Sequence, residues 1–151
     1  VFDGQSFAFD KGPGRFFLAP DDDVRGLAHT VPPTSDGSYV AVVHGAPDFV
    51  QVGSTVLSPR DLADLIRSDG NYQPGQPVRL LSCSTGAWPG GFAQQLANEL
   101  GAPVTAPTSL AWLPPEKDGS ILVTPANPFT DRPLRWFGQG LGEWKEFQPQ
   151  I

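Results

Sequence analysis

Residues 39–45 read YVAVVHG, and residues 78–84 read VRLLSCS. Each stretch opens with a continuous apolar run, which is typical of a strand buried on both faces of a parallel sheet. A third run of this kind, residues 103–107 (PVTAP), follows the second after a helical segment. The order strand, helix, strand, helix, strand predicts an α/β domain with a mostly parallel central sheet and right-handed crossovers. We therefore expect the strands that end at Val43 and Leu81 to be parallel neighbours inside the sheet.

The two segments between these strands have the pattern of helices. Ser58 and Pro59 supply an N-cap and a proline at the first helical position, and this helix is expected to end near Asp69. Residues 92–100 form a second apolar stripe at helical spacing, and Gly101 is suited to cap it. The side chains that we expect to be buried against opposite or adjacent faces of the sheet are Leu62, Ile66, Phe92 and Leu96.

The flanking segments have weaker patterns. Residues 48–57 resemble a short hairpin, and residues 15–20 (RFFLAP) a short strand. We interpret the acidic run at residues 21–23 as a solvated loop, because three adjacent carboxylates do not converge on one ion without a specialised loop. Residues 112–151 are predicted to form an aromatic C-terminal extension that packs back onto a core of residues 39–107.

The composition limits the class of protein. A chain of 151 residues with 39% hydrophobic content is expected to fold as a single domain, residues 1–151. Its net charge of −6 argues against nucleic acid and against an anionic membrane as partners. Cys83 is the sole cysteine, which excludes an internal disulfide and a multi-cysteine zinc site. We expect neither a metal nor a cofactor. A chain that starts at Val1, without a signal peptide pattern, is interpreted as a domain cut from a longer protein.

The residues expected to carry chemistry are Cys83 and His44. Each follows a predicted buried strand, and the carboxyl ends of parallel strands are where α/β proteins bind ligands. A thiol needs a nearby base to become a nucleophile, and His44 is suited to that role. The backbone N–H groups of Gly45 and Cys83 are then placed to stabilise an oxyanion. An inert buried thiol beside a structural histidine is the competing interpretation.

Other polar residues have less support from their context. Asp48 and Asp118 are candidates for a third, acidic member of the site, although a Cys–His dyad does not require one. His29 is not placed at the end of a predicted strand, so we expect it to be structural or exposed.

Four segments carry a resemblance to a known family: VAVVHGAPD (40–48), LSPRDLADLIRS (57–68), PVRLLSCSTG (77–86) and FAQQLANELGAPVTAP (92–107). Together they resemble the core of caspase-like cysteine peptidases, especially the self-processing peptidase domains of large bacterial toxins. The resemblance implies a caspase-like three-layer sandwich with a mostly parallel central sheet. It also implies that His44 is the general base or acid, that Cys83 is the nucleophile, and that the amides of Gly45 and Cys83 form the oxyanion hole.

The same resemblance implies a biological setting. The Cys83 segment and the aromatic tail are similar to C-terminal effector domains of bacterial polymorphic toxins. Such a domain is secreted as the C-terminal part of a larger bacterial protein, acts on a protein or peptide substrate and is neutralised by an immunity protein. The toxin processing domains bind inositol hexakisphosphate through clustered lysines and arginines, and the 10 basic residues of this chain are spread along its length.

Two other classes of function stay open at the level of sequence. The first is a toxin effector with another chemistry, such as NAD-consuming or deamidating, in which Cys83 only packs. Its feature is the glycine-rich loop at residues 86–91 (GAWPGG), a weak version of a phosphate loop. The second is a non-catalytic protein-binding module, for which Trp88 and Trp112 would be contact residues.

Overall fold

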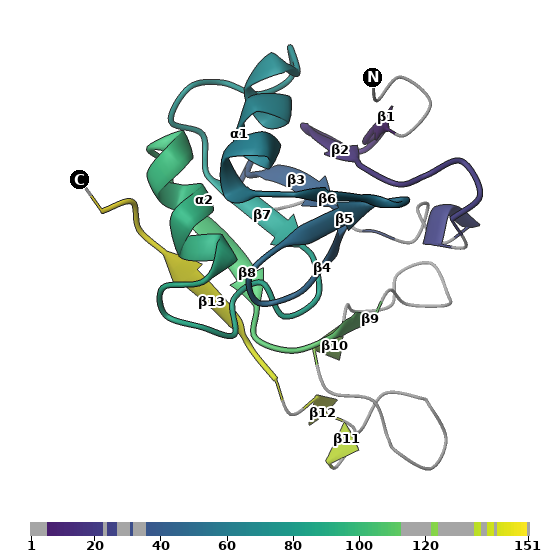
Figure 1. Cartoon of the computed structure of the whole chain (residues 1–151), viewed down its shortest axis with the longest axis vertical. Coiled ribbons are helices and arrows are strands. Elements are labelled where there is room, and N and C mark those ends of the chain that lie inside the picture. Colours follow the sequence, from purple (N-terminus) through teal and green to yellow (C-terminus); the bar gives the residue numbers. More distant parts are fainter. Residues whose placement is uncertain are drawn as a thin grey trace.

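The computed structural model describes residues 6–22, 24–26, 31, 36–112, 122–123, 135–136, 139–140 and 142–150. Within these residues, the largest sheet has the strand order β1-β2-β3-β7-β8-β13 (Figure 1). Its strands are β1 (Phe7–Ala8), β2 (Gly14–Phe16), β3 (Tyr39–Val42), β7 (Val78–Leu81), β8 (Val104–Pro107) and β13 (Trp144–Phe147).

The four central strands of this sheet are parallel. β2 pairs with β3, β3 with β7, and β7 with β8, all in the parallel sense, whereas β1 and β13 pair antiparallel at the two edges. Tyr39 lies opposite Val78, and Val42 lies opposite Leu81. The predicted α/β class, the mostly parallel sheet and the neighbouring positions of the two apolar strands are thus confirmed.

The two helices begin and end where their capping residues predict. In α1 (Pro59–Ser68), the Ser58 side chain accepts a hydrogen bond from the Asp61 N–H, and the Asp61 side chain accepts one from the Ser58 N–H. This reciprocal capping box satisfies two amides that a helix start otherwise leaves unpaired. α2 (Phe92–Leu100) ends at Gly101, whose φ of 64° is readily adopted only by glycine.

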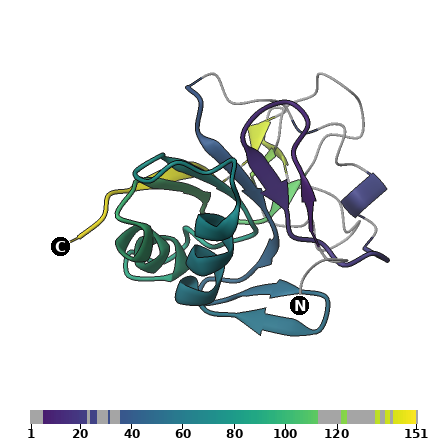
Figure 2. The same cartoon turned by 90° about the horizontal axis from the view of Figure 1, so that it is seen from above.

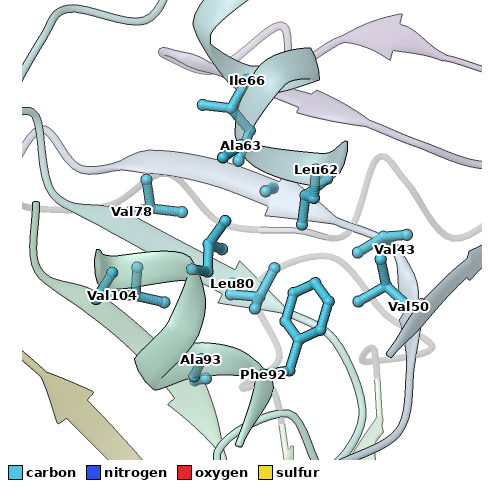
Figure 3. Packing of buried hydrophobic residues seen from close by; sticks show 14 of the residues in the cluster. Val43, Val50, Leu62, Ala63, Ile66, Val78, Leu80, Phe92, Ala93 and Val104 are labelled. Carbon is cyan, nitrogen blue, oxygen red and sulfur yellow. The ribbon is translucent and has the colours of Figure 1, made fainter. Parts of the chain in front are cut away.

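Both helices lie on one face of the sheet, and they contact each other (Figures 1 and 2). The physical reason is the strand order. The parallel strands follow one another in chain order across the sheet, so successive right-handed crossovers fall on the same side. Leu62, Ile66, Phe92 and Leu96 are fully buried, as predicted, but all four lie in one cluster on this single face and not on opposite or adjacent faces. Figure 3 shows part of this cluster around Leu80.

The second face of the sheet is covered differently. Val40, Val42 and Leu81, which alternate with the side chains under the helices, pack there against Phe9, Leu18 and Val31 from the N-terminal part. Ala111 and Trp144 add to this cluster. The predicted three-layer arrangement requires helices on this face as well, and none of the described residues forms an α-helix there.

The shorter strands form small separate sheets. β4 (His44–Gly45), β5 (Val50–Val52) and β6 (Thr55–Leu57) make an antiparallel sheet that contains the predicted hairpin. Two further pairs are β9 (Ala111–Trp112) with β10 (Leu122–Val123), and β11 (Arg135–Trp136) with β12 (Gln139–Gly140).

The central sheet extends beyond the predicted core. β2 joins it from the N-terminal side and β13 from the predicted C-terminal extension, where Phe147 is buried in the helix-side cluster. Neither helix in the described part of the chain has the length and apolar content needed to cross a membrane.

Candidate functional site

The candidate site lies where the chain leaves β2, β3 and β7 at their carboxyl ends. We call the residues that follow these strands, 17–22, 43–45 and 82–86, the carboxyl edge. Val43 N–H donates to the Leu81 carbonyl at 3.2 Å. A Cβ atom built on Gly45 would lie 2.1 Å from Ser82 Oγ and 3.1 Å from the Cys83 carbonyl oxygen. The segments that carry His44 and Cys83 are therefore in direct contact, and glycine is needed at position 45 for this approach.

Cys83 is partly buried and is held by the segment that leads into β9. Its Sγ accepts a hydrogen bond from the Ala111 N–H at 3.4 Å. The next residue, Ser84, has a φ of 60°, and its N–H donates to the Ser109 carbonyl at 2.9 Å. A non-glycine residue in this left-handed region is strained, and such residues gather at functional sites. The thiol thus lies just after β7, directly before a strained turn.

His44 is about half exposed, and its charged partner among the described residues is Asp22. Its Nε2 lies 2.6 Å from Asp22 Oδ2, and the Asp22 side chain is only 13% exposed. The other carboxylate oxygen, Oδ1, accepts a hydrogen bond from the Val24 N–H at 2.9 Å. The interpretation of residues 21–23 as a solvated loop is therefore wrong for Asp22, because its carboxylate is turned inward against His44.

The three residues follow the order of three adjacent strands. Asp22 comes after β2, His44 after β3 and Cys83 after β7. In the described part of the chain, the imidazole bonds to Asp22 and the sulfur to Ala111, and no hydrogen bond joins the imidazole to the sulfur. The structure thus brings the predicted base and nucleophile to neighbouring positions and adds an acid that the sequence did not single out.

The two amides expected to form an oxyanion hole are not used by the sheets. Within the described residues, the Cys83 N–H donates no hydrogen bond. Ala46 N–H donates to the Phe49 carbonyl at 2.8 Å, so the Gly45–Val50 pair is the non-hydrogen-bonded pair that comes next in the ladder. The Gly45 N–H consequently points away from β5.

Two of the three glycines in the loop at residues 86–91 have a structural explanation. A Cβ on Gly86 would lie 2.7 Å from the Ala106 carbonyl oxygen, and one on Gly91 would lie 2.7 Å from that of Pro47. The first amides of α2 are also occupied, since Phe92 N–H donates to Pro47 at 2.9 Å and Ala93 N–H to Thr85 at 3.1 Å. The amides that a phosphate would need at this helix start are thus taken by protein carbonyls.

His44 also borders a surface hollow of about 320 Å³. The hollow is lined by Ala19, Asp21, Asp22, His44, Gln51 and Gly53. No group of three or more His, Cys, Asp and Glu residues in the described part of the chain is arranged to hold a metal ion.

Of the remaining predicted candidates, the structure describes the side chains of Asp48 and Trp88. Asp48 is exposed and makes no contact with His44 among the described residues, so the acidic partner is Asp22 instead. Trp88 is exposed, at 51%. His29, Asp118 and the side chain of Trp112 lie outside the described residues. One sequence signal pointed toward Asp22, namely its place after a short strand, but nothing in the run of three aspartates distinguishes the one that turns inward.

The chain was also compared with known proteins. An uncharacterized Escherichia coli (strain K12) protein, YibJ, is 35% identical over 79 residues, which is 50% of this chain and 33% of the length of YibJ. No solved structure matches the chain. Residues 14–123, which hold both helices and the parallel strands β2, β3, β7 and β8, match one protein family. The chain therefore belongs to the family described as Domain of unknown function (DUF8616).

Proposed function

We propose that this domain is a cysteine-dependent hydrolase that cleaves amide bonds in a protein or peptide, with Cys83 as nucleophile and His44 as base. The observation that carries the proposal is the placement of both residues after adjacent central strands, with Gly45 packed directly against the Cys83 segment. The unused amides of Gly45 and Cys83 add the feature that acyl transfer needs beyond a nucleophile and a base.

The proposed reaction has two steps. In the first, His44 takes the thiol proton, the Cys83 sulfur bonds to the substrate carbonyl carbon, and the C–N bond breaks as the leaving amine takes the proton from His44. In the second, His44 removes a proton from water, the hydroxide oxygen bonds to the thioester carbon, and the C–S bond breaks. The proton on His44 then returns to the sulfur. Backbone N–H groups stabilise the negative charge on the carbonyl oxygen in both steps.

The caspase-like resemblance supplies the setting of the proposal. In it, the domain is an effector or processing domain of a secreted bacterial toxin and is neutralised by an immunity protein. The finer fold assignment, a caspase-like three-layer sandwich, is part of the same proposal. The His-before-Cys order on neighbouring parallel strands supports it, whereas the face without α-helices among the described residues does not.

The alternative of NAD-consuming chemistry has less support. Its sequence feature was the loop at residues 86–91, and two of the three glycines of that loop are explained by close contacts with Ala106 and Pro47. The exposed Trp88 suits a binding module as well as an enzyme, so it does not favour one over the other.

The first test measures how fast the single cysteine, Cys83, is alkylated. Iodoacetamide labels only Cys83 in this chain, so the alkylation rate at neutral pH measures the nucleophile directly. We expect faster alkylation than for a free thiol of pKa about 8.5, and loss of that advantage in His44→Ala. Asp48→Asn is the matched control, because Asp48 is an exposed charge three residues beyond Gly45.

Activity provides the second measurement. Cys83→Ala and His44→Ala should each abolish cleavage of a mixed peptide library, by several orders of magnitude, while circular dichroism shows an unchanged fold. Slow alkylation in both the unmodified protein and His44→Ala, or toxicity on expression that survives Cys83→Ala, contradicts the proposal.

A further inference from the structure

The Asp22–His44 contact is not required by a Cys–His dyad. It joins an anchored carboxylate to a half-exposed imidazole. Asp22 is nearly buried and is anchored by the Val24 N–H, whereas the His44 side chain is 49% exposed. A half-exposed imidazole has several accessible orientations, and its contact with an immobile carboxylate selects one of them. The 2.6 Å separation is that of a strong hydrogen bond to a charged acceptor.

This contact also determines which ring nitrogen carries the proton. An ionised carboxylate only accepts hydrogen bonds, so the nitrogen that faces Asp22 must donate. In the neutral imidazole, a proton on Nε2 leaves the lone pair on Nδ1. Nδ1 is then the atom available to accept a proton.

The strand order places His44 between the carboxylate of Asp22 and the thiol of Cys83. Asp22 follows β2 and Cys83 follows β7, and these strands flank β3, from which His44 extends. We propose that Asp22 is a positioning residue that holds the His44 proton on Nε2 and thereby presents Nδ1 as the base for the Cys83 thiol. The inference rests on the proposed function and deepens it from a dyad to an Asp–His–Cys relay.

The positioning role has a signature that a purely structural contact lacks. The tautomer of His44 can be read from the ¹⁵N chemical shifts of its imidazole, with His29→Gln used to assign the two histidines. We expect the Nε2–H form in the unmodified protein at a pH at which the imidazole is neutral. In Asp22→Asn, whose amide can also donate, we expect the Nδ1–H form or a mixture of both.

The matched control is Asp48→Asn, which makes the same change at an exposed aspartate outside the lining of the hollow. The iodoacetamide rate of Cys83 should fall at least about tenfold in Asp22→Asn, the scale of effect seen when a group that orients a functional histidine is removed. It should stay within about twofold in Asp48→Asn, since surface substitutions away from such contacts have small effects.

The outcomes separate this inference from the proposed function. A changed tautomer together with a slowed Cys83 supports both. An unchanged tautomer in Asp22→Asn overturns the positioning role, whatever the cysteine does. A changed tautomer with Cys83 equally slow in the unmodified protein and in His44→Ala overturns the hydrolase and the relay, and leaves Asp22 only as the partner that orients His44.

Discussion

The helix-covered face of the sheet and the carboxyl edge are built from the same strands, yet they differ in backbone strain and in how far their side chains are exposed. Under the helices, alternate side chains of β3 and β7 are fully buried and both helices are capped. At the carboxyl edge, Ser84 has a left-handed φ, and Ser82 Oγ is buried without a hydrogen-bond partner among the described residues. His44 is half exposed beside them. The Tyr72 hydroxyl on the helix-covered side also lacks a partner among the described residues, so the difference lies in the strain at Ser84 and the exposure of His44. Strain is expected where a site, rather than a core, is maintained.

The largest effect is expected from removing a side chain on the helix-covered face. Phe92 is fully buried at the start of α2, where Figure 3 shows it beside Leu80 and Val50. Phe92→Ala should lower the free energy of unfolding by about 3–5 kcal/mol, because it leaves a cavity that the close-packed strands cannot fill. Urea denaturation measures the change.

Trp88→Ala is the matched control for this prediction. It removes another large aromatic side chain, from the loop that precedes α2, but Trp88 is 51% exposed. Its effect should stay within about 0.5 kcal/mol. Similar losses in both variants would contradict the assignment of the core to the helix side.

The two regions also differ in how far the sequence predicted them. The runs ending at Val43 and Leu81, and the caps at Ser58 and Gly101, carry local signals, because burial and capping select residue types at fixed spacing. The Asp22–His44 contact joins residues 22 apart in the chain, and no local pattern marks it. The placement of both helices on one face depended on strand order, which residue patterns alone do not determine.

A second prediction concerns a buried polar contact beneath the helix-covered face. The Tyr39 hydroxyl donates to Asp69 Oδ2 at 2.6 Å, and Arg15 lies 3.3 Å from the same oxygen. Tyr39→Phe should cost about 2–3 kcal/mol, because it removes the shortest hydrogen bond to a buried charged acceptor and leaves Asp69 Oδ2 with only the longer one from Arg15. Tyr72→Phe is the matched control. The Tyr72 hydroxyl is buried without a partner among the described residues, so its removal should be neutral or stabilising.

The same contact predicts a pH dependence. Burial raises the pKa of Asp69, but the hydrogen bonds from Tyr39 and the Asn71 N–H, with the charge of Arg15, outweigh burial and hold the pKa below its usual value. Ionised Asp69 therefore stabilises the fold above about pH 4, near the unfolded pKa. This contribution is lost as the pH falls through the folded pKa. The stability difference between the unmodified protein and Tyr39→Phe should narrow below pH 4 in acid denaturation curves, and a constant difference would contradict the assignment.

A third prediction tests the close approach at the carboxyl edge. In Gly45→Ala, the new Cβ would meet Ser82 Oγ at 2.1 Å and the buried Thr85 Cγ2 at 2.8 Å. We expect a loss of about 1–2 kcal/mol, in the lower part of the range for overpacking because the short Ser82 side chain can rotate. Gly90→Ala is the control, since a Cβ at Gly90 meets nothing within 4 Å. Equal thermal midpoints for the two variants would show that the His44 and Cys83 segments are not packed together.

The smallest expected effect has the opposite sign. A left-handed φ costs an L-residue about 1–2 kcal/mol, and glycine avoids this strain at an entropic cost of about 0.5–1 kcal/mol. Ser84→Gly should therefore raise the stability by about 0.5–1 kcal/mol. Ser84→Ala, which keeps the strain and removes only the hydroxyl, should not. If the strain serves to fix the thiol, Ser84→Gly should also slow the alkylation of Cys83 by a few-fold, because the turn that holds the sulfur near Ala111 becomes looser. A variant that gains stability without losing reactivity would show that the strain at the carboxyl edge is unrelated to the thiol, and one that loses stability would show that the turn is not strained.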